Sequence, residues 1–560
     1  MTLGFPGQLD TTAAGGCDRR RISPTLAREG MIASQHPLVS AAGLRVLAAG
    51  GNAVDAAVAA ALVGTVVLPS RCGIGGDLFA VTGRAEGDGQ RLAFHGSGIA
   101  PRGTSLEFMH EHGEDAPDGR RVLAQHGPLS PSVPGFVAGC FALLEHYGTM
   151  SFADLCAAAV GYATDGFPIS PAEAHGIEAT SDRLRPYPTT AAVFLPGGRP
   201  LQAGELLRQE NLARSIGRIA TDGPDAFYRG AITKEIATYL AANGGALTAD
   251  DFADHETMVS PALATSYRGY TVYETGLPTQ GFVVLEALNI CENAPIGDVG
   301  LQSATAVHTE VSALRLAFAD RRATAGDPDF VETPMERLLS KAWAKEHFAS
   351  IPPRYTEIDS GVLTPGDTTS LVAVDRDGLM ISLIFTLSAS FGSGVVAGET
   401  GILLTNRAGH CFELEDGHPN LYAPGKRTMH TLNCYLIADA DDTPVLVGGT
   451  PGGDYQPQWN VQTITGLIDG GLDVQAAAEQ PRWQFQPATY PIERGEPFSL
   501  TVEERLGERT ISALEGMGYP VERAGMWGAG GSVQVIARDP ETGFLAGGSD
   551  PRAEGMAVGL

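Results

Sequence analysis

The sequence predicts an α+β protein in which outer helices cover paired inner sheets. Two observations lead to this prediction. Helical apolar spacing dominates up to Gly361, whereas β-rich stretches become prominent in the residues that follow. A helix expected over residues 53–66 is apolar nearly all round, so it should be buried against a sheet. Helices and sheets that each bury an apolar face stack in layers.

The individual elements follow from periodicity, capping residues and glycines. An amphipathic helix over residues 38–49 ends at Gly50-Gly51, and Asn52 caps the buried helix that follows. The glycine-rich segment 71–76 lacks the Lys-Ser/Thr ending of a phosphate-binding loop and leads into a strand, so we interpret it as close backbone packing. Further helices are expected over residues 137–147, 152–164, 171–179, 204–221, 232–243, 281–292, 304–323, 459–468 and 474–479. Strands are expected over residues 78–82, 92–95, 267–274, 370–374, 380–387, 434–437, 444–449 and 533–538.

The composition changes at Thr364-Pro365-Gly366, which suits an exposed and cleavable loop. We therefore divide the chain into a large part, residues 31–367, and a small part, residues 368–560. Residues 1–30 contain no apolar signal-peptide segment and are expected to form a mobile tail.

The charge balance excludes several classes of function. Lys and Arg total 38 against 65 Asp and Glu, which gives a net charge of −27. Such an excess repels phosphate backbones and anionic membranes, so neither nucleic acid nor membrane is an expected partner. The seven cysteines are scattered without a Cys-x-x-Cys pair, so no metal site is expected and reduced thiols in a cytoplasmic protein fit best.

A β-hairpin is predicted over residues 368–390, with its turn centred near Asp377. This register places Thr368 opposite Thr386 on one face of the sheet, close enough for their hydroxyls to form a hydrogen bond. Threonine is also a good strand former, so the hairpin alone favours a purely structural pair.

Short motifs along nearly the whole chain carry a resemblance to the γ-glutamyltranspeptidase family of N-terminal-nucleophile hydrolases. Any one of them would be weak evidence, whereas so many in the family's order are specific. The motifs are Gly50–Ala57, Gly73–Asp77, Ser132–Gly135, Gly326–Phe330, Thr368-Thr369, Gly398–Gly401, Pro451–Gly453 and Ser549–Arg552.

The resemblance implies a four-layer αββα sandwich and a precursor that cuts itself between Asp367 and Thr368. The Thr368 hydroxyl would attack the preceding carbonyl, and the α-amine freed by the cut would then serve as the base for the same hydroxyl. Thr386 matches the family's second threonine. Gly452 and Gly453 match the glycines whose N–H groups form the oxyanion hole, where a side chain would block close approach. No cofactor is expected.

The residues that recognise glutamate in the family are replaced here. The segment that carries the family's carboxylate-binding arginine reads His95-Gly96-Ser97-Gly98 and contains no arginine. A Ser-Ser pair corresponds to His430 and Thr431. The positions that hold the α-ammonium group in the family correspond to Ser388, Arg407 and His410.

Most of these replacements introduce a basic side chain. Arg407, His410, His430 and His95 would make the pocket electropositive, and arginine offers a planar fork for a carboxylate. We therefore expect an acyl group that carries a carboxylate but no α-ammonium. The alternative is that these residues pair with nearby acids such as Glu413 or Glu415.

Residues 426–432 and 452–458 resemble a non-γ-glutamyl branch of the family, which includes oxamate amidohydrolase and C–C-cleaving homologues of alkylproline antibiotic biosynthesis. The prediction is a self-processing threonine hydrolase that cleaves an amide of a small oxalyl-type acyl group through an acyl-enzyme. Three alternatives remain: a C–C bond hydrolase that releases oxalate, a genuine γ-glutamyl hydrolase or transferase, and a non-catalytic scaffold. The expected partners are a small-molecule substrate and the chain's own two subunits, which could dimerise further.

Overall fold

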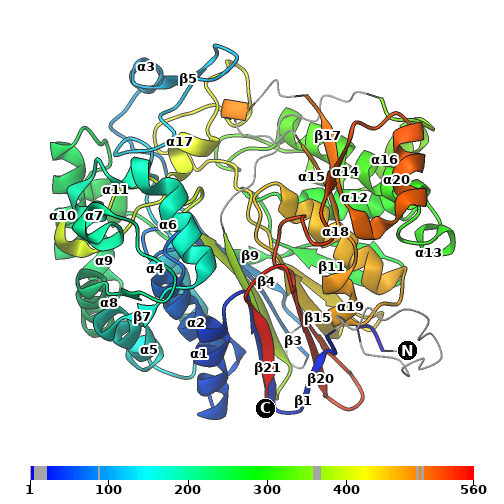
Figure 1. The fold of residues 1–560 in the computed structure, drawn as a ribbon, viewed down its shortest axis with the longest axis horizontal. Helices are drawn as coiled ribbons and strands as arrows, with labels where there is room; N and C mark the ends of the chain where they lie inside the picture. Colours follow the sequence, from blue (N-terminus) through cyan, green and yellow to red (C-terminus); the bar gives the residue numbers. More distant parts are fainter. Residues whose placement is uncertain (1, 5–21, 86–88, 357–367, 487–490, 494–496) are drawn as a thin grey trace.

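Two seven-stranded sheets face each other at the centre of the computed structural model, and helices cover both outer faces (Figure 1). The structure describes residues 2–4, 22–85, 89–356, 368–486, 491–493 and 497–560. The arrangement is the predicted four-layer αββα sandwich.

Both large sheets are antiparallel throughout, and each combines strands from before and after Thr368. The first sheet has the order β21 (Met556–Gly559), β2 (Gly30–Ser34), β12 (Thr369–Asp375), β13 (Leu379–Thr386), β3 (Asp77–Arg84), β4 (Leu92–Gly96) and β9 (Met258–Pro261). The second has the order β1 (Thr25–Ala27), β20 (Leu545–Ser549), β19 (Gln534–Arg538), β15 (Pro444–Gly449), β14 (Tyr435–Ala438), β11 (Tyr270–Glu274) and β10 (Leu263–Tyr267).

Helices from the first half of the chain form one side of the molecule, and most later helices form the other (Figure 1). The first group comprises α1 (Pro37–Ala48), α2 (Ala53–Val67), α3 (Leu106–Glu111), α4 (Phe136–Tyr147), α5 (Phe152–Asp165), α6 (Pro171–Leu184), α7 (Pro188–Phe194), α8 (Glu210–Asp222), α9 (Asp225–Tyr228), α10 (Ala231–Ala242) and α11 (Ala249–Ala253). The second comprises α12 (Gly281–Cys291), α13 (Ile296–Val299), α14 (Ala304–Thr324), α15 (Met335–Leu338), α16 (Lys341–Ser350), α18 (Tyr455–Ile468), α19 (Val474–Glu479) and α20 (Glu508–Gly516).

Smaller elements complete the fold. The short helix α17 (Arg407–Cys411) follows the β-hairpin. A three-stranded sheet lies outside the sandwich and consists of β16 (Trp483–Gln486), β17 (Ser499–Glu503) and β18 (Val521–Ala524). Two-stranded pairs are formed by β5 (Glu114–Asp115) with β6 (Arg121–Val122), and by β7 (Phe167–Pro168) with β8 (Leu206–Leu207).

Three apolar cores hold the layers together. One lies between the first sheet and the helices of the first group, the second between the second sheet and the later helices, and the third between the two sheets. Helix α2 is buried at every position, as its sequence predicted. Its capping box is also present, because the Asn52 side chain accepts N–H groups of the first turn and Asp55 accepts the Asn52 N–H.

Two predicted elements differ from the structure in type over part of their length. The helix expected over residues 204–221 begins only at Glu210, because residues 206–207 pair with β7 instead. The single strand expected over residues 267–274 is the second half of a hairpin, β10–β11, with a turn at Arg268 and Gly269. Both turn residues have positive φ, 52° and 88°, which no periodicity reveals.

The predicted tail differs from the structure where it is described. Residues 25–27 form strand β1 against β20, and Leu3 is buried in the second core. Residues 1 and 5–21 lie outside the described residues.

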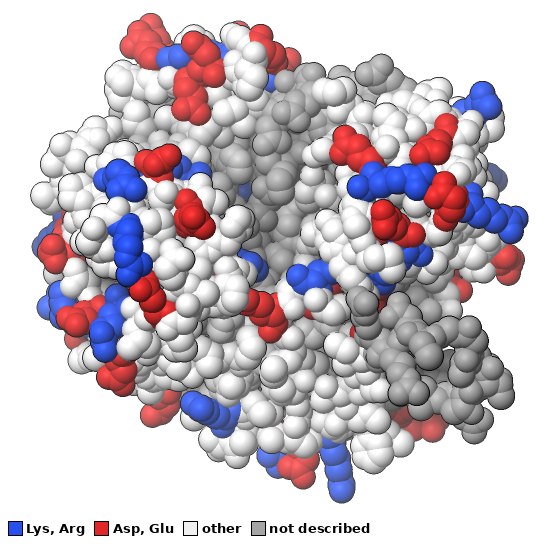
Figure 2. All heavy atoms as spheres, in the orientation of Figure 1, with Lys and Arg blue, Asp and Glu red and all other residues white. Residues whose placement is uncertain are grey.

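The described surface carries charged side chains of both signs. On the face seen in Figure 2, acidic and basic side chains are interspersed, and the surface is hollowed between its left and right sides. None of the described helices is both long and apolar enough to cross a membrane. All six described cysteines are free and buried.

Candidate active site

The hairpin β12–β13 has the predicted register. Its pairs run from Val374 opposite Met380 to Thr369 opposite Phe385, so the next pair is Thr368 opposite Thr386. The Thr368 hydroxyl donates to Thr386 Oγ1 at 3.3 Å. The expected pairing of the two hydroxyls is therefore present.

Further hydrogen bonds hold both threonines. Ser388 adopts φ 83°, uncommon for a residue with a side chain, and its N–H donates to Thr386 Oγ1 at 2.8 Å. The Gln35 side-chain amide donates to the Thr368 carbonyl at 3.2 Å. Thr386 is fully buried and Thr368 is 3% exposed, so the pair is fixed at the base of an opening rather than on a mobile surface.

A cleft of about 550 Å³ opens beside Thr368. Its wall includes the rings of Tyr455 and Trp459 and the charged side chains of Arg71 and Glu554. The cleft is large enough for a drug-sized molecule. Other lining residues are Gln35, Leu68, Ala172, Pro451, Gly452, Gln484, Gly530, Gly531, Ser532, Arg552 and Ala553.

Gly452 borders this cleft, and Gly453 follows it just before α18. Gly452 has φ 130°, and a Cβ there would lie 2.3 Å from the Trp459 ring, so a side chain does not fit. Gly453 has φ 57°. Their carbonyls accept N–H groups of the first turn of α18, whereas neither glycine N–H donates to another described residue. These two N–H groups are thus available for an oxygen of a ligand.

A buried polar network behind the glycines fixes their loop. Gln280, immediately before α12, donates through its side-chain amide to the carbonyls of Gly453 and Thr431. Arg321 on α14 donates to the Gln280 side-chain oxygen and forms an ion pair with Asp454. Satisfied networks of this kind hold one geometry, because each broken bond would leave a buried polar group unpaired.

Five of the six residues expected to bind substrate form two hydrogen-bonded sets, and helix α17, which carries both Arg407 and His410, joins these sets. The Ser388 hydroxyl contacts His410 Nδ1 at 3.0 Å, and Arg407 donates to the Thr431 hydroxyl at 3.4 Å. Arg407 and His430 are joined through Asp77, whose Oδ2 lies 3.5 Å from Arg407 Nε and 3.1 Å from His430 Nε2.

His95 does not join this group directly. It lies on β4, where its Nε2 is 3.3 Å from the Ser260 hydroxyl. The Phe79 ring packs against both His95 and His430, with centroid distances of 5.8 and 4.6 Å. His95 is therefore a residue of the layer between the sheets. None of the six residues lines the cleft beside Thr368.

The charges in this group differ from the expectation. Burial, followed by the neighbouring Arg407, lowers the pKa of His410 to about 3 and that of His430 to about 4. Burial likewise lowers the pKa of His95 to about 4. These histidines are neutral at pH 7, so Arg407 alone of the four carries positive charge.

Arg407 forms an ion pair with Asp77. Glu413, an alternative partner considered from the sequence, lies 3.9 Å from His418.

Sequence reasoning missed Asp77, Gln35 and Gln280 as parts of the site. Asp77 had one available signal, since a carboxylate that follows Gly76 and opens a buried strand needs a partner. Its other oxygen, Oδ1, is buried without a hydrogen bond to a described residue. Asp367 lies outside the described residues.

Comparisons with known proteins agree with this geometry. The family model described as gamma-glutamyltranspeptidase matches residues 39–560. The glutathione hydrolase-like YwrD proenzyme of Bacillus subtilis is 37% identical over 537 residues, covering 95% of this chain and 98% of that protein. The oxamate amidohydrolase proenzyme of Klebsiella pneumoniae is 34% identical over 544 residues, covering 96% of this chain and 99% of that protein.

A solved structure extends the likeness to the whole fold. The crystal structure of a cephalosporin acylase from Bacillus halodurans matches with a TM-score of 0.87 and 33% identity, over 99% of both chains. A four-layer sandwich with a threonine at the start of a central strand defines an N-terminal-nucleophile hydrolase. Together with the sequence matches, this means that the chain belongs to the γ-glutamyltranspeptidase family and is an amidohydrolase of that family.

Proposed function

We propose that this protein is a self-processing threonine amidase that releases a small, carboxylate-bearing acyl group of the oxalyl type. The observation that carries the proposal is the hydrogen bond between Thr368 and Thr386 beside a cleft bordered by Gly452. This arrangement supplies a nucleophile, a group that orients it and backbone donors for an oxyanion.

Maturation would begin with attack of the Thr368 hydroxyl on the Asp367 carbonyl, which converts the peptide bond to an ester. Water then hydrolyses the ester and leaves Thr368 with a free α-amine. In the enzymatic reaction this amine takes the hydroxyl proton as Oγ1 attacks the substrate carbonyl. The N–H groups of Gly452 and Gly453 stabilise the resulting oxyanion. Collapse of the tetrahedral intermediate expels the amine part of the substrate and leaves an acyl-enzyme. Water then hydrolyses the acyl-enzyme and releases the acid.

The acyl group is proposed to be small because the region behind Thr386 is already filled. Arg407 is 1% exposed and His430 and Asp77 are fully buried, so little room remains for a long acyl chain. Arg407 would receive a substrate carboxylate in competition with Asp77. The leaving group, by contrast, would face the 550 Å³ cleft and the rings of Tyr455 and Trp459. An amide with a small acidic acyl part and a bulky amine part fits both observations.

The same cleft supports a second candidate, hydrolysis of a C–C bond that releases oxalate from a bulky 2-oxo acid. Substrate assays separate the two. Oxamate-like amides would yield ammonia or an amine, and 2-oxo-acid-bearing pyrrolines would yield oxalate.

Maturation is tested on a denaturing gel with N-terminal sequencing. The wild type should give two bands, the smaller beginning at Thr368, and Thr368→Ala should remain one inactive chain. A wild type that stays a single chain after long incubation would leave only a scaffold role. Mass spectrometry of the quenched reaction should show the acyl group on the small subunit.

Acyl specificity is tested at Arg407. Arg407→Lys keeps the charge opposite Asp77 but loses the planar fork, so KM should rise about tenfold for a carboxylate-bearing amide and stay unchanged for its neutral analogue. Arg407→Ala should raise KM further while self-cleavage continues. Arg84→Ala, at an exposed position of β3, is the matched control. Equal KM values in all three variants would contradict the pocket assignment but not the threonine mechanism.

A further inference from the structure

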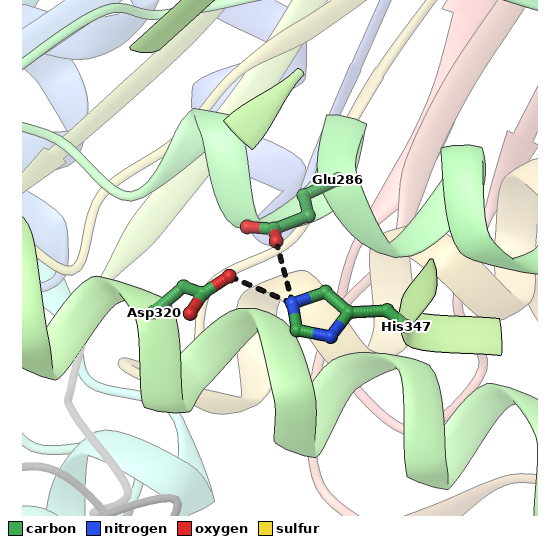
Figure 3. A group of neighbouring side chains, drawn as sticks. All are labelled: Glu286, Asp320 and His347. Carbon is green, nitrogen blue, oxygen red and sulfur yellow. Dashed lines mark hydrogen bonds and ion pairs between the residues drawn. The ribbon is translucent and has the colours of Figure 1, made fainter. Parts of the chain in front are cut away.

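Three helices of the outer layer bring a carboxylate pair and an imidazole together away from the cleft. Glu286 extends from α12, Asp320 from α14 and His347 from α16 (Figure 3). His347 Nε2 lies 2.9 Å from Asp320 Oδ2 and 3.7 Å from Glu286 Oε1. One potential ligand atom of each residue lies within 4.8 Å of the other two.

Two carboxylates share one imidazole partner in this cluster. Among the described residues, His347 is the one ion-pair partner of both carboxylates. The Trp343 indole N–H donates to Glu286 Oε1 and Asp320 Oδ2, at 3.2 and 2.8 Å. Glu286 is fully buried, yet its Oε2 has no hydrogen-bond partner in the described chain. A buried carboxylate oxygen without a partner is costly, and either a proton on Glu286 or a bound cation would relieve that cost.

We propose that Glu286, Asp320 and His347 form a structural site for a divalent metal ion of the zinc type. The ligands would be His347 Nε2 and one oxygen from each carboxylate, with water in the fourth position. Zinc bonds of about 2.0–2.2 Å in a tetrahedron separate the ligand atoms by roughly 3.4 Å. The observed 2.9 and 3.7 Å lie on either side of that value. One imidazole with two carboxylates favours zinc over calcium or magnesium, which prefer oxygen-only sites.

The position also suits metal entry. The side chains of His347 and Asp320 are 15% and 20% exposed, whereas Glu286 forms the buried floor. The cluster is therefore partly open to solvent on the side of His347 and Asp320.

The role of the ion would be structural. None of the three ligands lines the cleft beside Thr368. The ion would join α16 to α12 and α14, and these two helices also carry the network that holds the Gly453 loop: Gln280 immediately precedes α12, and Arg321 follows Asp320 on α14. Fixing the spacing of α12 and α14 would stabilise that network as well as the outer layer.

The test uses the processed full-length protein, stripped with a chelator and dialysed. Calorimetric titration with Zn²⁺ should give one site per chain, and Zn²⁺ should raise Tm. Glu286→Gln and His347→Gln should each weaken zinc binding by about tenfold or more and remove the Tm rise. Glu413→Gln is the matched control, because Glu413 is a buried carboxylate beside a histidine without a second carboxylate in the pair. It should bind zinc like the wild type.

Two outcomes would overturn the proposal. If the folded wild type binds no stoichiometric zinc, the cluster is a hydrogen-bonded tie between helices and nothing more. If zinc binds with unchanged affinity in both ligand variants, the ion lies elsewhere. Should the variants fail to fold, anomalous diffraction at the zinc edge from wild-type crystals locates the ion directly. A peak away from His347 would then reject the site.

Discussion

At the scale of single residues, Thr386 matters because of what its hydroxyl oxygen accepts. That oxygen accepts hydrogen bonds from both the Thr368 hydroxyl and the Ser388 N–H. In the proposed mechanism it would orient the nucleophile without reacting itself. We expect Thr386→Val, which keeps the shape and removes the hydroxyl, to lower kcat by roughly 10- to 100-fold with little change in KM. Steady-state kinetics on fully processed protein measures this.

The matched control is Thr82→Val on the neighbouring strand β3, where the threonine is also buried but lies away from Thr368. This variant should retain wild-type kcat. If Thr386→Val changed KM and kcat no more than the control does, Thr386 and Thr368 would be a purely structural cross-strand pair.

The neutral histidines make a second prediction at this scale. The folded pKa of His410 is about 3, below the ordinary value of 6.5, chiefly because of burial and then because of Arg407. Above pH 6.5 both the folded and the unfolded states hold the neutral form. Below it the unfolded state takes up a proton that the folded state does not, so stability falls by about 1.4 kcal/mol per pH unit towards the folded pKa.

We therefore expect His410→Asn to lose less stability than the wild type between pH 7 and pH 4.5. Between these pH values the variant should lose about 2–3 kcal/mol less unfolding free energy than the wild type. Urea unfolding of both proteins at the two pH values measures it. Parallel losses would mean that His410 is protonated in the folded protein.

At the scale of elements, the start of α12 supports the loop that carries Gly452 and Gly453, the proposed oxyanion donors. Gln280 holds the carbonyls of Gly453 and Thr431 and is itself held by Arg321. We expect Gln280→Ala to lower kcat by up to roughly 100-fold, since a displacement of about 1 Å at a reacting group has that effect, while KM changes little. Gln475→Ala on α19, another buried glutamine bonded to backbone, should leave kcat unchanged. Equal kcat in the two variants would contradict the positioning role.

The elements that sequence patterns predicted well are those with local signals. Helix α2 carries its own cap at Asn52, and the hairpin β12–β13 has its register fixed by the turn near Asp377. The errors at residues 204–210 and at the β10–β11 turn have non-local or conformational causes. Strand β8 exists because it pairs with β7, far away in the sequence, and Arg268 adopts a positive φ without a sequence signal of its own.

The same distinction applies to the candidate site. Thr368, Thr386 and the glycines could be proposed from sequence because both threonines lie in a predictable hairpin and the glycines match a motif. The partner of Arg407 could not, since Asp77 reaches it only through the pairing of β3 with β13. The histidine charges depend on burial, which only the assembled layers define.

At the scale of the whole molecule, the cut before Thr368 would fall inside an interleaved fold. Five strand pairings join residues before the cut to residues after it: β2–β12, β3–β13, β11–β14, β1–β20 and β2–β21. All three cores also contain side chains from both parts. Separating the two parts would expose these cores to water and break the hydrogen bonds of all five strand pairings. This would be comparable to opening the core of a domain.

We therefore expect the processed subunits to remain one particle and to unfold together. Size-exclusion chromatography and native mass spectrometry of cleaved protein should show both subunits in a one-to-one complex, and dilution should not release either. Thermal unfolding monitored at both subunits should give one transition, because neither part retains a complete sheet alone. Release of a folded small subunit under native conditions would contradict this, and the uncleaved Thr368→Ala protein provides the reference for an intact chain.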